Sequence, residues 1–185
     1  MIRPMLDVNQ QVGQITVDLR LGTDFLISYQ GRKPYIDATS YEQKLSSIKD
    51  FFLPHRRKFG DEIILHPHQT ILCSSLEYIK LPENVFAILS MRSTYSRLGL
   101  TISTLIQAGY CGCVSIELTN ANNNPIRVAV GARIFQARLY LLSDKVPYSY
   151  NTRKYVAQVR PIPADVEDDK DLAILKRIYQ QEFPE

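Results

Sequence analysis

Apolar and polar residues alternate over several short stretches of this chain, and many of these stretches end at glycine, proline or asparagine. The first stretch, QITVDLRLGTDFLIS at residues 14–28, alternates on both sides of Gly22. A period of two predicts strands with one buried face, and the central glycine predicts a bend between two short strand segments. Six later stretches share the pattern: EIILHP, TILCSSLEYIKLP, FAILSMRS, GCVSIELTN, PIRVAVG and ARIFQARLYLLS. Short strands with frequent turns predict a mainly β barrel or sandwich.

Two segments carry a helical pattern instead. Within residues 38–60 the apolar residues lie at helix-like spacing, and a basic run follows at residues 55–58, which we interpret as a solvated loop. Near the C-terminus, ADVEDDKDLAILKRIYQQEF begins with acidic residues and continues with Leu172, Leu175 and Ile178 at helical spacing. Negative charge favours the N-terminus of a helix, so this tail is predicted to be an amphipathic helix.

Length and composition predict one compact domain. The chain has 185 residues, of which 45% are hydrophobic and 22% are charged, as in an ordinary globular protein with one sizeable core. We expect a domain over residues 1–160 and a C-terminal extension over residues 161–185. No stretch approaches the roughly 20 apolar residues of a membrane helix, and the start lacks the apolar core of a signal peptide. We therefore expect a cytoplasmic protein without a membrane partner.

Charge and metal-binding residues restrict the possible partners. Lys and Arg total 22 against 19 Asp and Glu, and this net charge of +3 is too mild to predict a nucleic-acid partner, although small anionic ligands fit it. Three cysteines without a zinc spacing predict reduced thiols. Three histidines fall within residues 55–68, which leaves a shared metal site as the alternative to a loop-rich surface.

A first candidate site is the stretch RSTYSRLGL at residues 92–100. Two arginines and several hydroxyl groups surround a predicted turn at the end of the apolar run FAILSM. Guanidinium groups bind phosphate oxygens with two parallel hydrogen bonds, and hydroxyls and turn amides supply further donors. The stretch therefore favours phosphate recognition, with a plain surface turn as the alternative.

A second candidate is Glu117, a carboxylate within the apolar strand CVSIELTN. Strict alternation places Val114, Ile116 and Leu118 on one face of this strand. The other face then carries Cys113, Ser115, Glu117 and Thr119. Glu117 is either a functional acid or a residue that simply faces water, because polar faces are common on antiparallel strands.

A third candidate is the segment Lys154–Gln158, which follows Tyr148, Tyr150 and Arg153. It predicts either a cation-bearing lid or an ordinary C-terminal linker.

Together these stretches resemble a known family. The strings RSTYSRLGL, AGYCGCVSIELTN and PIRVAVGARIFQARLY, with KYVAQ near the end, are similar in order and spacing to deoxycytidine triphosphate (dCTP) deaminases of the trimeric dUTPase superfamily. The resemblance covers about residues 14–160. It implies a dUTPase-like, distorted, jelly-roll-like β-barrel with short helices, a nucleotide-binding domain over residues 1–160, and a homotrimer with sites between subunits.

The resemblance also implies roles for individual residues. Glu117 matches the catalytic glutamate, which takes a proton from water and returns it to the pyrimidine ring and the leaving amine. Ser93 and Arg97 match the residues that orient this water and keep the glutamate ionised. The implied substrate-binding residues are Arg92, Thr94, Tyr95, Ser96, Gln107, Ser115, Ile116, Tyr150 (with Tyr148 as the competing alignment), Lys154 and Gln158.

The implied chemistry is hydrolysis of dCTP to dUTP and ammonia, with dTTP as an inhibitor in relatives. Magnesium accompanies the triphosphate, and the protein itself binds no metal. The zinc deaminases carry H-x-E and a later P-C-x-x-C, and neither string occurs here, which excludes their zinc-hydroxide route.

Three departures from the family pattern qualify these expectations. Gln107 stands where the family has an aspartate that binds the sugar 3'-hydroxyl, and glutamine cannot act as an anionic base. This change argues against cleavage of the triphosphate, and therefore against a bifunctional enzyme. The family's N-terminal helix has no counterpart, and the tail from Asp165 onward extends past the usual end. A catalytically inactive nucleotide-binding or regulatory relative is the alternative function, and a dUTPase is a weaker one.

Overall fold

A computed structural model describes residues 1–29, 36, 46–148, 157–164 and 171–182. In chain order its elements are β1 Ile2–Arg3, α1 Val8–Gln11, β2 Thr16–Ser28, α2 Ser46–Lys49, β3 Phe52–Arg56, β4 Glu62–Leu65, β5 Thr70–Lys80, β6 Val85–Met91, α3 Ser93–Ser96, β7 Leu100–Thr101, β8 Thr104–Ile106, β9 Cys111–Asn120, β10 Ile126–Ala129, β11 Arg133–Leu141 and α4 Asp171–Glu182. The six later stretches with alternating patterns are β4, β5, β6, β9, β10 and β11, so the prediction of a mainly β protein is confirmed.

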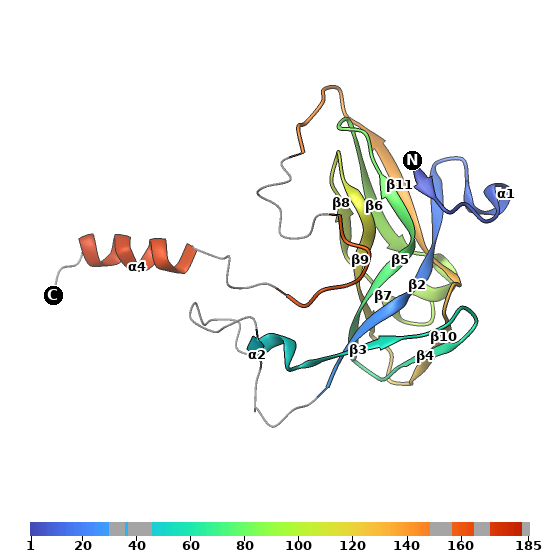
Figure 1. Ribbon diagram of the computed structural model, residues 1–185, viewed down its shortest axis with the longest axis horizontal. Coiled ribbons are helices and arrows are strands. Elements are labelled where there is room, and N and C mark those ends of the chain that lie inside the picture. Colours follow the sequence, from blue (N-terminus) through green and yellow to red (C-terminus); the bar gives the residue numbers. More distant parts are fainter. Residues whose placement is uncertain (30–35, 37–45, 149–156, 165–170, 183–185) are drawn as a thin grey trace. The chain divides into compact units, whose positions relative to one another are not determined.

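The main sheet has the strand order β7-β9-β5-β2-β11-β6-β8, and every pairing in it is antiparallel. β1 pairs with β5, β3 pairs with β2, and β10 with β4 forms a separate two-stranded sheet. β8, at one end of the order, also contacts β9 near the other end (Figure 1). The main sheet is therefore curled into a distorted barrel, and the prediction of such a barrel is confirmed.

β2 connects the two halves of this sheet. Its first part pairs with β11 and its second part pairs with β5, with a register shift between Leu21 and Phe25. The sequence pattern predicted two short segments bent at Gly22, but the structure has one continuous strand that changes partner at this position. A Cβ atom on Gly22 would lie 2.7 Å from the carbonyl oxygen of Ser74, so the close approach of β5 explains the glycine.

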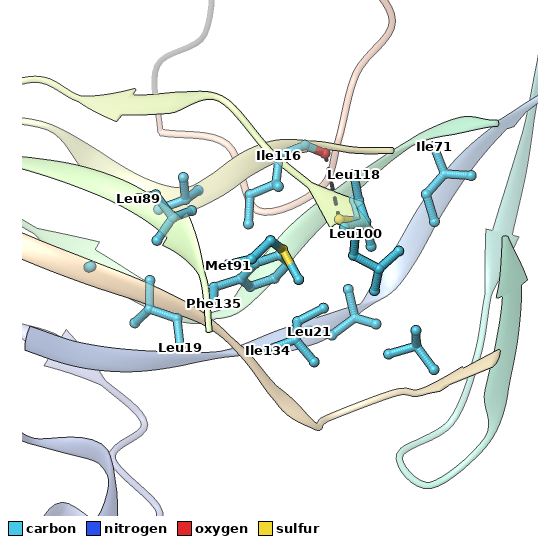
Figure 2. Close-up of a cluster of buried hydrophobic side chains, with 14 of the residues drawn as sticks. Leu19, Leu21, Ile71, Leu89, Met91, Leu100, Ile116, Leu118, Ile134 and Phe135 are labelled. Carbon is cyan, nitrogen blue, oxygen red and sulfur yellow. Dashed lines mark hydrogen bonds between the residues drawn. The ribbon is translucent and has the colours of Figure 1, made fainter. Parts of the chain in front are cut away.

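The core lies inside the curled sheet. Side chains from six strands point toward one another there, and ten of them are labelled in Figure 2: Leu19, Leu21, Ile71, Leu89, Met91, Leu100, Ile116, Leu118, Ile134 and Phe135. Each is at most 9% exposed, because the alternating pattern turns one face of every strand inward. Burial of this apolar surface is the main favourable term in the folding of the barrel.

A buried polar group anchors the N-terminal segment to the barrel. Glu77 on β5 has no exposed surface, and its carboxylate accepts hydrogen bonds from Gln11 Nε2 (3.0 Å) and from the backbone N–H of Arg20 (2.8 Å). Gln11 Oε1 in turn accepts from the backbone N–H groups of Leu6 and Asp7. These hydrogen bonds compensate for burial of the polar atoms.

The chain forms two compact units, residues 1–27 with 54–162 and residues 28–53 with 163–185. In the second unit Phe51 is buried, and its backbone groups bond Ile48 and Tyr29. The helical pattern predicted within residues 38–60 is only one turn long among the described residues, because residues 52–56 form a strand. The C-terminal helix is confirmed as α4, and the boundary at residue 160 stays a prediction.

Candidate active site

Glu117 lies on the outward face of β9. Val114, Ile116 and Leu118 are at most 3% exposed, whereas the Glu117 side chain is exposed, as the alternation predicted. Among the residues that the structure describes, Glu117 makes no side-chain hydrogen bond or ion pair. In a single chain its carboxylate is therefore accessible to a ligand. Ser115, a predicted substrate contact, is half-buried on the same face.

An open depression of about 400 Å³ lies beside this carboxylate. Thr101, Ile102, Ser103, Glu117 and Thr119 line it. Thr101 on β7 pairs directly with Thr119 on β9, and directly opposite residues of an antiparallel pair project to the same face. The depression therefore combines one carboxylate with several hydroxyl groups that can donate and accept hydrogen bonds. The β7 wall was not predicted from the sequence, since a two-residue strand is too short to show an alternating pattern.

The predicted phosphate-binding stretch forms α3, a single helical turn after β6. Arg92 is its N-cap residue and Arg97 its C-cap residue. The side chains of Ser93, Thr94, Ser96 and Arg97 are exposed, and Tyr95 is half-buried against the core. Arg97 makes no side-chain hydrogen bond or ion pair within the described part of the chain. Four of the predicted ligand-binding side chains are thus available on one short turn.

Arg92 differs from these residues because it is held from inside the sheet. Its Nε lies 3.0 Å from Asp18 Oδ2, and its guanidinium donates to the carbonyl oxygen of Arg133 (3.0 Å). Asp18 is 7% exposed and also lies 3.8 Å from Arg133 Nη1, while Gln136 Nε2 donates to its other oxygen (3.4 Å). Two guanidinium groups around one carboxylate leave a net positive charge beside α3. Asp18 was not predicted, although its place within the apolar run ITVDLRL is a signal for a buried partner of a cation.

The C-terminal segment approaches the start of β9. The N–H of Ala157 donates to the carbonyl oxygen of Cys111 (3.0 Å), and the N–H of Cys113 donates to that of Gln158 (2.7 Å). Both side-chain polar atoms of Gln158 are buried and lack a hydrogen-bond partner among the described residues. Gln158 therefore bonds the start of the strand that carries Glu117, and its side-chain amide is buried there. Tyr150 and Lys154 lie outside the described residues.

The remaining candidate groups are Gln107 and the cysteine thiols. Gln107 is exposed after β8, and its carbonyl oxygen accepts from the N–H of Tyr110 (3.1 Å). Burial raises the pKa of the Cys73 thiol, with the charge of Glu117 adding to the effect, and burial also raises the pKa of Cys113. Both thiols are therefore weak nucleophiles at neutral pH. No group of three or more potential metal-ligating side chains forms among the described residues.

In one chain, then, the structure places Ser115 and Glu117 on the same face of β9, bonds Gln158 to the start of that strand, and groups Arg92–Arg97 in and beside α3. Ile116 is the exception among the predicted β9 contacts, because its side chain is fully buried and only its backbone can face a ligand. No hydrogen bond or ion pair joins the α3 side chains to Glu117 among the described residues.

The curled antiparallel sheet, with a carboxylate on its outer face and a cationic turn at the end of β6, defines a mainly β protein with a distorted-barrel fold. The model of the dCTP deaminase-like family matches residues 1–142, and the chain belongs to this family.

Individual relatives agree with this assignment. A protein from Methanobrevibacter smithii named "dCTP deaminase, dUMP-forming" is 30% identical over 178 residues, which cover 92% of this chain and 89% of the relative. A dCTP deaminase from Haemophilus ducreyi is 30% identical over 174 residues, 88% of each chain. The crystal structure of 2'-deoxycytidine 5'-triphosphate deaminase from Agrobacterium tumefaciens shares the fold, with a TM-score of 0.56 and 22% identity. That alignment covers 75% of this chain but only 41% of the Agrobacterium chain.

None of the helices in the described part of the chain is long and apolar enough to cross a bilayer.

Proposed function

We propose that this protein is a dCTP deaminase that converts dCTP and water to dUTP and ammonia. The observation that carries the proposal is the position of Glu117, an accessible carboxylate at the wall of a hydroxyl-lined depression in a chain of the dCTP deaminase-like family. A carboxylate in this position can move protons between water and a bound base.

In the proposed reaction, water adds to the ring carbon that carries the amine, and the bond from this carbon to the amine then breaks. Glu117 takes one proton from the attacking water and delivers it to the adjacent ring nitrogen. It then moves the second proton of the water to the amine, which leaves as ammonia. Both protons are thereby accounted for, and Glu117 ends in its starting charge state.

Ser93 and Arg97 are assigned to orienting this water and keeping Glu117 ionised. They are exposed on α3 and do not contact Glu117 among the described residues of one chain. We therefore propose that the complete site forms between the subunits of a homotrimer, where α3 of one copy can face β9 of another. Enclosure between subunits would also remove the exposed Glu117 from bulk water, which strengthens its interaction with Arg97.

The other predicted residues are assigned to the substrate by their chemistry. Gln107 is assigned to the sugar hydroxyl, and the backbone at Ser115 and Ile116 to the base. The α3 group supplies cationic and neutral donors for the triphosphate, and these are Arg92, Thr94, Tyr95 and Ser96. The closing segment contributes Tyr150, Lys154 and Gln158.

Magnesium is proposed to enter as part of the substrate. This cation keeps several water ligands and binds phosphate oxygens readily, so a triphosphate can carry it without a dedicated set of protein ligands. In that role it would neutralise part of the phosphate charge beside Arg92.

The product is proposed to be dUTP rather than dUMP, even though some relatives are named as dUMP-forming. Cleavage of the triphosphate needs a base to activate water, and the amide of Gln107 cannot accept a proton as a carboxylate does. Chromatography of the products of dCTP turnover tests this point, and dUMP with pyrophosphate as the initial products would contradict it.

The decisive experiment is ammonia release from dCTP by the wild type and by Glu117→Gln. We expect the substitution to lower the rate by about a hundredfold or more, because glutamine cannot shuttle the proton. Glu83→Gln is the matched control, since Glu83 is another exposed glutamate, and its rate should stay at the wild-type level. Equal rates for wild type and Glu117→Gln would remove Glu117 from the mechanism.

An inactive nucleotide-binding relative is the second candidate function, because Gln107 replaces an acidic group at the predicted sugar site. Calorimetry that shows dCTP binding without any turnover by the wild type would favour it over the deaminase.

A further inference from the structure

We infer that Asn122 is a positioning residue that fixes the end of α3, and with it Arg97, to β9 of the same chain. In the proposed homotrimer this contact holds Arg97 in place for the Glu117 of a neighbouring copy. This inference rests on the proposed function, because it gives Arg97 a part in the reaction. Asn122 lies in the loop between β9 and β10 and belongs to none of the stretches from which the function was predicted.

The need for such a residue follows from the length of α3. The helix is one turn long, and so short a helix is unstable on its own because its few hydrogen bonds do not offset the entropy of ordering its residues. Arg97 follows directly after this turn and is exposed. Arg92 and Tyr95 hold the first part of the turn, so the position of Arg97 at its end depends on what holds the chain at Leu98 and Gly99.

Asn122 holds the chain at this point. Its Nδ2 donates to the carbonyl oxygen of Leu98 (3.0 Å), and the N–H of the preceding residue, Ala121, donates to the carbonyl oxygen of Gly99 (2.8 Å). These are the hydrogen bonds that tie the carbonyl groups of Leu98 and Gly99 to the loop after β9. Two successive carbonyl groups beyond Arg97 are thus bonded to the loop that follows β9.

The same loop is rigidly attached to β9. Asn120 has no exposed surface, and the two hydrogens of its Nδ2 are shared among three carbonyl oxygens, those of Leu65 (3.0 Å), His66 (3.2 Å) and Asn124 (2.9 Å). Its Oδ1 accepts from the N–H of Asn122 (2.9 Å). Asn122 is therefore connected through Asn120 to the strand that carries Glu117.

Gly99 makes the close approach possible. It has a φ of +94°, and a Cβ atom on it would lie 2.9 Å from the Cβ of Asn122 and 3.2 Å from its backbone nitrogen. A larger residue there would separate the two loops. The contact between Leu98–Gly99 and Ala121–Asn122 thus depends on the absence of a side chain at Gly99 as well as on the amide of Asn122.

The test uses two substitutions of Asn122 that remove its donor. Asn122→Ala deletes the amide, and Asn122→Asp keeps the shape and the Oδ1 acceptor but lacks the N–H group. We expect both variants to lower kcat for dCTP about three- to tenfold and to leave KM within about twofold. The physical reason is that, without the hydrogen bond from Asn122 to Leu98, Arg97 is held less firmly in its orientation. Hydrogen exchange of the amides at residues 96–99 should become several-fold faster in both.

Asn124→Ala is the matched control. Asn124 lies in the same loop, but its side chain makes only a long hydrogen bond to Asn122 (3.4 Å), so kcat and exchange should stay at the wild-type values. Wild-type kcat in Asn122→Asp, unchanged exchange at residues 96–99, or an equal loss in Asn124→Ala would overturn the inference. A wild type without deaminase activity would instead refute the proposed function, and the exchange measurement would still decide whether Asn122 holds α3.

Discussion

Glu77 is the most deeply buried acidic residue among those that the structure describes, and its environment opposes its charge. Burial raises the pKa of this carboxyl above the ordinary value of 4.5, and the hydrogen bonds from Arg20 and Gln11 only partly oppose the shift. The folded protein therefore holds the proton of Glu77 more tightly than the unfolded chain does. The contribution of Glu77 to stability is highest at low pH and falls as the pH rises from about 4.5 to the raised value.

This linkage predicts a pH-dependent effect of Glu77→Gln. The two oxygens of Glu77 accept from Gln11 Nε2 and from the N–H of Arg20, and a glutamine must point its own NH2 group at one of these donors. We therefore expect the variant to lose about 1–3 kcal/mol of unfolding free energy at low pH, because one donor is left without an acceptor. That deficit should shrink as the pH rises above 4.5, since only the wild type then pays for a buried charge. Urea denaturation at several pH values measures the difference, with Glu83→Gln as the exposed control. A deficit that is constant or grows with pH would contradict the raised pKa of Glu77 in the folded protein.

At the scale of elements, β2 decides how the barrel is built. One strand of thirteen residues pairs with β11 at one end and with β5 at the other, so both halves of the sheet share it. The change of partner occurs next to Gly22, where the backbone of β5 leaves no space for a side chain. The position of β5 in turn sets the register of β9, and hence the position of Glu117.

Gly22→Ala is therefore expected to destabilise the barrel. The added Cβ would meet backbone oxygens of Ser74 (2.7 Å) and Ser75 (3.2 Å), and two backbones can separate only by disturbing the β2–β5 pairing. We expect a loss of about 1–3 kcal/mol, as for other overpacked sites. Thermal and urea denaturation measure it, and Thr23→Ala, on the neighbouring residue, should cost clearly less. A Gly22→Ala protein as stable as the wild type would show that β5 can move away freely.

For the whole molecule, a single chain leaves both the candidate site and several apolar side chains open to solvent. Ile88 and Leu105 are directly paired on β6 and β8 and are 40% and 59% exposed, and the rings of Phe86 and Tyr140 stack with centroids 5.0 Å apart nearby. Exposed apolar clusters of this kind are common where subunits associate. They agree with the proposed homotrimer, in which the site would be completed by a second copy.

The trimer makes a prediction about mass and activity together. Light scattering after gel filtration should give three times the 21.2 kDa of one chain. If the site lies between subunits, specific activity should fall on dilution in parallel with the dissociation of the trimer. A monomer with full activity would contradict the shared site, while leaving the role of Glu117 to the substitution experiment.

Sequence patterns were most informative where one strand carries its own signal. The alternation in CVSIELTN predicted the buried and exposed faces of β9, and the C-terminal helix followed from its period and its acidic start. The helical pattern predicted within residues 38–60 was wrong for residues 52–56, because they form β3, whose pairing partner β2 is distant in the sequence. Asp18 and Asn122 went unrecognised because their roles depend on partners from other elements.

The sequence alone was enough to predict the longer strands, the apolar face of β9, and the family that the motifs resemble, because these properties depend on residues that are close along the chain. The tertiary structure alone decided that Asp18 holds Arg92, that Gly22 touches β5, and that the loop after β9 holds the end of α3. These contacts join residues far apart in the chain, and their geometry is set by how the sheet curls around its core.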